Sequence, residues 1–447
     1  MAIRFLVALA ALAFPVAASS QTKATEGFHL SGSIRLRYET IADTARIGVP
    51  RAEDLVNLRT IVTARYTHGP LAIVAELFDS RAYDDTAPSA VSSNEVDPLE
   101  LSQAYLGVDF GAALGRGSDL RVQAGRLLLD IGSRRLIATP NYRNTTNGFT
   151  GIRADLSLPG KRSAILFYVL PQQRLPDDPV GIAANRAVFD REGFDARLWG
   201  GSIRQGGVLG GGEIELSGYR FEERDRPDRA TRDRRLSTLG VRLFRPAAPG
   251  RFDYDGEVMR QTGSTRAGLA PAAPLRPVAA WFAHAEVGYQ WQRGWKPHVS
   301  AEFDYASGDR PGGSYARFDT LFGVRRADFS PSGLYNAINR ANLITPGVRL
   351  EVTPSKRLDA FVSYRELWLA SRFDAFATTG VADPSGRAGR YAGRQVDARV
   401  RWWAVPKRLQ LEADGVLLDK GGFYARAPNS PGTGTTAYLS LNATAFF

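Results

Sequence analysis

The sequence predicts an all-β fold: a single antiparallel transmembrane β-barrel of about 18 strands, with short periplasmic turns and long extracellular loops. Apolar and polar side chains alternate with a period of two along most of the chain, as they do in strands that have one apolar and one polar face. The connections between these runs alternate between short and long, and the last run ends on the aromatic residue Phe447. Such features are typical of barrels that span bacterial outer membranes.

The N-terminus predicts export. A short basic start at Met1–Arg4 precedes an apolar run at Phe5–Phe14, and small residues follow at Ala18 and Ser20. This is the pattern of a secretory signal peptide, and the apolar run is too short to cross a bilayer as a helix. We therefore expect residues 1–20 to be a signal peptide and residues 21–447 to form the barrel. After cleavage, we expect the protein to lie in the outer membrane of a Gram-negative cell.

Alternating runs begin at Phe28. In the first run, Ile34 and Leu36 share one face while Arg35 and Arg37 share the other. Many runs have the nine to thirteen residues that a tilted strand needs to cross a bilayer. The predicted strands are 28–40, 55–67, 71–81, 99–110, 119–127, 151–158, 163–170, 195–204, 212–222, 234–244, 252–261, 279–291, 296–305, 345–353, 357–367, 393–403, 407–418 and 436–447.

The connections favour the same fold. Short turns lie at 67–70, 159–161, 292–295, 353–356 and 405–407. The long connections are rich in Gly, Pro, Asp and Arg, and they include 82–98, 128–150, 171–194, 262–278, 306–344, 368–392 and 419–435. Short turns on one side and long loops on the other are expected of an outer-membrane barrel. The terminal run 436–447 is typical of the strand that the barrel-insertion machinery of diderm bacteria recognises.

The charged residues are mostly arginines. The chain has 51 Arg and six Lys against 46 acidic residues, and its net charge is +11. The planar fork of Arg suits carboxylates and phosphates. We do not expect nucleic acid as a partner, because the basic residues are spread through alternating runs and form no basic helix or arm.

Catalysis and bound cofactors are not expected. The chain has no Cys and only four scattered His, and it contains none of the common hydrolase, metalloprotease or nucleotide-binding motifs. The acid pairs Asp84/Asp85 and Asp177/Asp178 offer oxygen donors for Ca²⁺. Paired loop acids are usually solvated, so we predict no metal site.

The polar faces of the strands predict a lumen with walls of mixed charge. Most of these charges can simply pair and stiffen the barrel. Two groups of arginines lie on predicted strands that closure of the barrel brings near each other: Arg35, Arg37, Arg59 and Arg65 in one group, and Arg399 and Arg401 in the other. Together they suggest a positive field that steers anions. The basic segment Gly125–Asp155 is either a solvated surface loop or a loop that folds inward and narrows the passage.

Four segments resemble the alginate-export family of outer-membrane barrels. They are AELFDSRAY at 75–83, LSQAYLGVDF at 101–110, the Gly-Arg…Gly…Arg-Leu-Ile…Phe-x-Gly-x-Arg pattern within 125–153, and YASGDRPGG…FDTLFG at 305–323. Thr150, Gly323 and Tyr142 depart from the family pattern, which has Asp, Pro and commonly Trp at these positions. The resemblance implies an arginine-rich conduit for a polyuronate, with loops that gate both ends.

We therefore predict an anion-selective outer-membrane channel for an alginate-like polyuronate or related acidic oligomers. Its expected partners are outer-membrane lipid, an anionic polysaccharide or oligosaccharide, and components of a periplasmic export complex. The alternatives are a porin for small anionic nutrients and a non-conducting scaffold or adhesion barrel. The predicted pore-lining residues are Arg35, Arg37, Arg59, Arg65, Arg126, Arg135, Arg153, Arg349, Arg365, Arg399, Arg401, Glu76 and Asp155.

Overall fold

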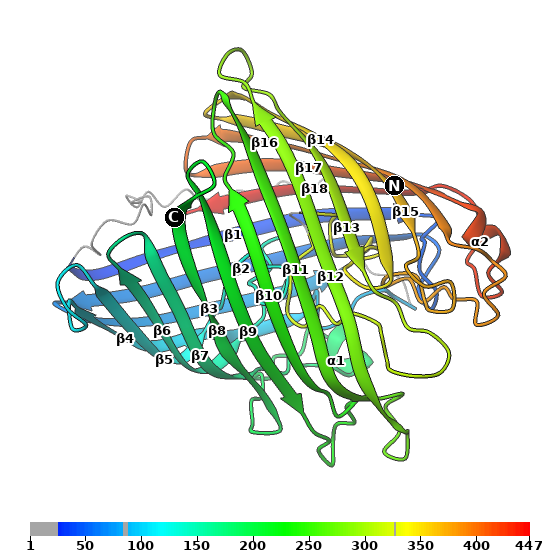
Figure 1. Ribbon diagram of the computed structural model, residues 1–447, viewed down its shortest axis with the longest axis horizontal. Helices are drawn as coiled ribbons and strands as arrows, with labels where there is room; N and C mark the ends of the chain where they lie inside the picture. Colours follow the sequence, from blue (N-terminus) through cyan, green and yellow to red (C-terminus); the bar gives the residue numbers. More distant parts are fainter. Residues whose placement is uncertain (1–25, 84–87, 326–327) are drawn as a thin grey trace.

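Eighteen antiparallel strands form a closed barrel in the computed structural model, which describes residues 26–83, 88–325 and 328–447 (Figure 1). The predicted signal peptide, residues 1–20, and Asp84/Asp85 lie outside the described residues. Each strand pairs with its neighbours in sequence, and β1 closes the barrel against β18, seen in Figure 1 as blue beside red. The strands are β1 (Gly27–Ala42), β2 (Glu53–His68), β3 (Leu71–Tyr83), β4 (Asp97–Gly111), β5 (Asp119–Leu127), β6 (Phe149–Leu158), β7 (Arg162–Pro171), β8 (Ala196–Val208), β9 (Gly212–Glu223), β10 (Arg235–Arg245), β11 (Arg251–Arg266), β12 (Leu275–Gln290), β13 (His298–Ala306), β14 (Leu343–Ser355), β15 (Leu358–Trp368), β16 (Tyr391–Val405), β17 (Leu409–Lys420) and β18 (Thr436–Phe446).

The barrel has charged side chains inside and apolar side chains outside. In β1, Arg35 and Arg37 are 5% and 1% exposed, whereas Ile34 and Leu36 are 45% and 52% exposed. A soluble protein would expose the arginines and bury the aliphatic side chains. The reverse arrangement is that of a barrel whose outer face contacts lipid and whose closed hydrogen bonding leaves no sheet edge in the membrane. The predicted fold class is therefore confirmed.

The two ends of the barrel differ in the lengths of their connections. At one end, turns of two to seven residues join the strands, and at the other the connections have eight to 36 residues. Two short helices, α1 (Pro179–Ala183) and α2 (Gly422–Arg426), lie in the long connections. Among the described residues, no helix is long and apolar enough to cross a membrane.

One predicted connection, 262–278, is shorter in the structure, where it spans residues 267–274. Residues 262–278 belong largely to β11 and β12, which continue as a hairpin with paired residues such as Ser264 and Pro277. This segment is rich in Gly, Pro and Ala, residues with little preference for strands. Pairing with a neighbouring strand overrides that weak local preference.

Two long connections fold back into the barrel and join each other there. They are loop A, residues 128–148, and loop B, residues 307–342. The backbone N–H of Phe322 donates to Leu136 O at 3.0 Å, and the N–H of Ala138 donates to Phe322 O at 3.2 Å. The Phe322 ring packs edge-on against Phe149, with 5.2 Å between the ring centroids. Buried apolar residues of both loops, including Leu136, Ile137, Phe329, Tyr335 and Ile338, form part of a core inside the barrel.

Candidate functional site

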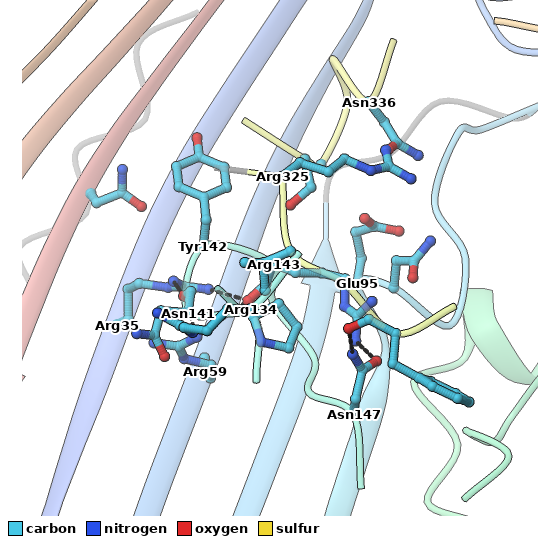
Figure 2. Close-up of a pocket in the computed structure, with 18 of the residues that line it drawn as sticks. Arg35, Arg59, Glu95, Arg134, Asn141, Tyr142, Arg143, Asn147, Arg325 and Asn336 are labelled. Atoms are coloured by element: carbon cyan, nitrogen blue, oxygen red, sulfur yellow. Dashed lines mark hydrogen bonds between the residues drawn. The ribbon is translucent and has the colours of Figure 1, made fainter. Parts of the chain in front are cut away.

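Loop A is fixed to the wall formed by β1 and β2 by two arginines that face inward. Arg35 Nη1 and Arg59 Nη1 each donate to Asn141 O at 2.9 Å. Arg35 Nη2 also donates to Asn144 Oδ1 at 3.1 Å. Figure 2 shows Arg35 and Arg59 beside Asn141. Period-two alternation directs these guanidiniums into the lumen, where they meet backbone carbonyls of the loop rather than carboxylates.

Tyr142 extends this attachment to the closing strand. Arg37 Nη2 donates to Tyr142 O at 2.6 Å, and its guanidinium lies 3.9 Å from the centre of the Tyr142 ring. The Tyr142 hydroxyl is hydrogen-bonded to Tyr438 Oη at 2.8 Å and to Ser440 Oγ at 2.6 Å, both on β18. Loop A thus contacts the wall on both sides of the β1–β18 junction.

Arg135 fixes the other end of loop A across the lumen. Its guanidinium is 5% exposed and forms ion pairs with Asp255 at 3.1 Å and Glu257 at 2.9 Å on β11, and with Asp328 of loop B at 2.9 Å. Although burial opposes ionisation, the Arg135 and Arg340 guanidiniums lower the pKa of Asp328 well below its ordinary value. Loop A therefore spans the lumen between β11 on one side and β1, β2 and β18 on the other.

A cavity of about 990 Å³ lies between this loop and the wall. It reaches from the long connections, at Asn94 and Asp177, into the barrel half that carries the short turns, at Gln410 and Phe446. Its charged lining is strongly unequal, with ten arginines and three carboxylates. The arginines are Arg35, Arg59, Arg134, Arg143, Arg174, Arg229, Arg325, Arg349, Arg399 and Arg401, and the carboxylates are Glu95, Asp177 and Glu412.

Several of these guanidiniums are held by neutral acceptors. Arg143 Nη2 donates to Asn147 Oδ1 at 2.6 Å, and Arg174 Nε donates to Ser93 O at 2.8 Å. Within the described part of the chain, no carboxylate forms an ion pair with Arg35, Arg59, Arg143 or Arg174.

Burial and neighbouring arginines lower the pKa values of two loop arginines. Burial, with a further contribution from Arg174, lowers the pKa of the Arg143 guanidinium well below its ordinary value. Burial together with Arg46 and Arg340 lowers the pKa of Arg325 to about 10. Figure 2 shows Arg134, Arg143 and Arg325 gathered near Arg35 and Arg59. Arg134 pairs with Asp130 at 2.9 Å, whereas an anion entering here would meet Arg35, Arg59 and Arg143 without a carboxylate paired to them among the described residues.

Five of the residues predicted from the sequence line this cavity: Arg35, Arg59, Arg349, Arg399 and Arg401. Arg349 is paired with Glu351 at 2.7 Å. Arg399 and Arg401 on β16 share Asp359 of β15, at 2.7 and 2.9 Å. These three arginines belong to the charge-paired part of the wall.

The other eight predicted residues do not line the cavity. Arg37 and Arg135 lie under loop A in the contacts described above, and Arg365 is buried near Asp304, at 3.4 Å. Arg65 donates to Tyr105 Oη at 3.3 Å, and Arg153 pairs with Asp155 at 2.7 Å. Glu76 accepts hydrogen bonds from Thr63 and Ser102, and Arg126 pairs with Glu192 at 3.0 Å and with Glu100.

Sequence reasoning left five lining arginines out of the predicted set: Arg134, Arg143, Arg174, Arg229 and Arg325. All of them lie in long connections, where no alternation indicates which side chains point inward. The available signal was composition, because loop A carries three arginines and one acid over residues 128–148.

Comparison with known proteins supports the fold and identifies a family. The family model described as alginate export matches residues 28–437. No curated protein matches the chain.

Solved structures with the same architecture include OccD3 (OpdP) of Pseudomonas aeruginosa, with a TM-score of 0.56 and 15% identity over 94% of this chain and 91% of that one. A BenF-like porin from Pseudomonas fluorescens Pf-5 has a TM-score of 0.58 and 11% identity over 94% and 99% of the two chains. OccK2 (OpdF) of Pseudomonas aeruginosa, solved with glucuronate, has a TM-score of 0.55 and 12% identity over 95% and 98%. At these identities the likeness shows the barrel fold alone.

Proposed function

Since the chain belongs to the alginate export family and forms an outer-membrane channel, we propose that its cargo is an anionic polysaccharide, an alginate-like polyuronate or its acidic oligomers. The observation that carries this proposal is the charge of the cavity lining, in which Arg35, Arg59, Arg143 and Arg174 form no ion pair with a described carboxylate. A polyuronate presents many carboxylates along one chain, and Arg binds carboxylates with a planar, two-pronged donor. The arginines are distributed along the passage, so the cargo can exchange one weak contact for the next.

The arginines with neutral acceptors are proposed to contact the cargo directly. Arg143 and Arg174 keep their hydrogen bonds to loop oxygens, so their positions are set before an anion arrives. Fixed donors stabilise an incoming charge without first being reorganised. Conduction also requires that the cargo can leave, and contacts at several weak sites satisfy this requirement better than one tight site.

A porin for small carboxylates is the second candidate, and the course of loops A and B favours it. Both loops fold into the lumen and narrow it, and Arg135 holds loop A against the far wall. A narrow passage suits single sugar acids, and OccK2, which has the same fold, was solved with glucuronate. In this case the same arginines would bind one carboxylate at a time.

Single-channel recording of the refolded protein in planar bilayers tests these proposals. We expect anion-selective current that polyuronate blocks and that neither a neutral glucan nor free glucuronate at the same sugar concentration blocks. Equal block by glucuronate would instead support the small-anion porin. Unblocked or cation-selective current would contradict the arginine-lined route, and the absence of current would move the scaffold alternative to first place.

A further inference from the structure

Three buried carboxylates meet at the long-connection end of the barrel, away from the cavity lining. Asp97 and Glu100 belong to β4, and Asp190 belongs to the connection between β7 and β8. One oxygen of each lies within 4.8 Å of the others, and the three residues are 1%, 2% and 5% exposed. Like charges this close and this buried repel strongly unless a proton or a cation lies between them.

The backbone of β4 is irregular where it brings two of these acids together. Residues three apart on a regular strand point to opposite faces. Here the pairing with β3 is irregular between Phe78 and Ser80, and Leu99 adopts a left-handed conformation with φ of 59°. As a result Asp97 and Glu100 are both buried while Leu99 is 46% exposed.

The hydrogen bonding around the cluster leaves one side open. The backbone N–H groups of Leu175 and Asp190 donate to Asp190 Oδ1 and Glu100 Oε2, both at 2.7 Å. Asp97 Oδ1 is buried and accepts no hydrogen bond from any residue that the structure describes. A buried carboxylate oxygen without a hydrogen bond, in a side chain this close to two other carboxylates, lacks a donor or a cation.

One divalent cation would balance the local charge. Arg126 pairs with Glu100 and Glu192, and Arg174 is within electrostatic reach of Asp97 and Asp190. With Arg143, which interacts with Glu95 and Asp97, three guanidiniums face the five carboxyl groups of Glu95, Asp97, Glu100, Asp190 and Glu192, so the carboxyl groups outnumber the guanidiniums by two.

We propose that Asp97, Glu100 and Asp190 bind one divalent cation, and that this cation is Ca²⁺. The donors are all carboxylate oxygens, which suit hard cations rather than Zn²⁺ or Cu²⁺. Ca²⁺ takes roughly six to eight oxygen ligands in flexible geometry, and three carboxylates with water can supply them. The cation joins the end of β4 to the connection that carries Gln172, Arg174 and Asp177 at the mouth of the passage. It is therefore a structural tether for that connection.

The test is calorimetric titration of the detergent-solubilised protein with CaCl2 after chelator treatment, together with thermal unfolding at increasing CaCl2. We expect about one Ca²⁺ per chain and an unfolding temperature that rises with the logarithm of the Ca²⁺ concentration above the dissociation constant, because binding favours the folded state. Asp97→Asn and Asp190→Asn should lose both the binding heat and the Ca²⁺-dependent rise. Their unfolding temperature without Ca²⁺ should not fall, because each removes charge repulsion.

Asp178→Asn is the matched control. Asp178 lies in the same connection, is paired with Arg186 at the surface, and caps α1. Asn is an equally good cap, so the helix is preserved. This variant should retain the full Ca²⁺ response. Absence of binding heat in the native chain, or an equal rise in unfolding temperature in Asp97→Asn, would overturn the proposal. The buried carboxyl groups would then share protons instead of a cation. None of these readouts depends on conductance, so they are independent of the proposed cargo.

Discussion

Single arginines differ in what they can do for an anion, and the difference lies in their partners. Arg153 is neutralised by Asp155 at 2.7 Å, whereas Arg143 is held by the Asn147 amide oxygen and the Thr145 carbonyl. A paired guanidinium adds little to the electric field in the lumen, because its carboxylate partner cancels most of its charge. A buried guanidinium with neutral acceptors acts at longer range, because little water or counter-charge screens it.

Arg143→Gln should therefore reduce the preference of the channel for anions. Glutamine retains a donor for Asn147 and removes only the charge. We expect the permeability ratio of chloride to potassium to fall by roughly threefold, as one unscreened charge is lost from the passage. The measurement is the reversal potential in a KCl gradient. Arg162→Gln, at the exposed start of β7, is the control for charge alone and should leave the ratio unchanged. An equal fall in both variants would contradict the assignment.

At the scale of the structural element, loop A depends on Arg135. This side chain is 5% exposed and holds Asp255, Glu257 and Asp328 together. Removing one partner from a buried ionic network leaves charge uncompensated, at a cost of about 3–5 kcal/mol. Arg242 still pairs with Asp255 at 2.8 Å, so the lower end of that range applies.

Arg135→Gln should consequently destabilise the barrel in urea titrations by about 3 kcal/mol and free one end of loop A. Single channels should then show additional current fluctuations as the loop moves in the lumen. Arg153→Gln breaks a half-exposed pair in the wall and should cost about 1 kcal/mol or less, without added fluctuations. Quiet channels in Arg135→Gln would mean that the Tyr142 attachment alone holds the loop.

The elements themselves show how far sequence reasoning reaches. All eighteen predicted runs correspond to observed strands, since lipid outside and water inside impose a period of two at every step. The same rule predicted that Arg399 and Arg401 face inward, but not that Asp359 of β15 pairs with both. Loop A and loop B have no period, and Arg135 meets Asp328 from 193 residues away. Their inward course depends on the assembled barrel, so local patterns could not predict it.

At the scale of the whole molecule, closure of the barrel depends on close contact at the β1–β18 junction. Gly32 N donates to Phe447 O at 2.9 Å, and Phe447 N donates to Gly32 O at 3.1 Å. A Cβ atom on Gly32 would lie 2.3 Å from Ile61 O and 2.5 Å from the Phe447 ring. Only glycine leaves room for the terminal aromatic residue at this position.

Gly32→Val should therefore lower the yield of closed barrel. The fraction that migrates as the compact form on unheated denaturing gels should fall several-fold after refolding. Gly107→Ala on β4 is the control, because the nearest atoms to its added Cβ lie 3.7 Å away, an ordinary contact. Full yield from Gly32→Val would show that the last residue contributes little to closure.

The positive field of the passage is a property of the whole lumen, and it should depend on salt. The Debye length is about 10 Å at 0.1 M ionic strength and about 3 Å at 1 M. Arginines spread from Arg174 at the mouth to Arg35 and Arg59 on the wall act together only when their fields overlap. We therefore expect anion selectivity, measured as reversal potential at a fixed KCl ratio, to fall steadily as the mean concentration rises from about 0.1 to about 1 M. The decline should be shallower in Arg143→Gln, which has less field to screen. A selectivity that stays constant over this range would place discrimination in close contacts at the narrowest point, and the distributed arginines would then serve mainly to hold loops A and B in place.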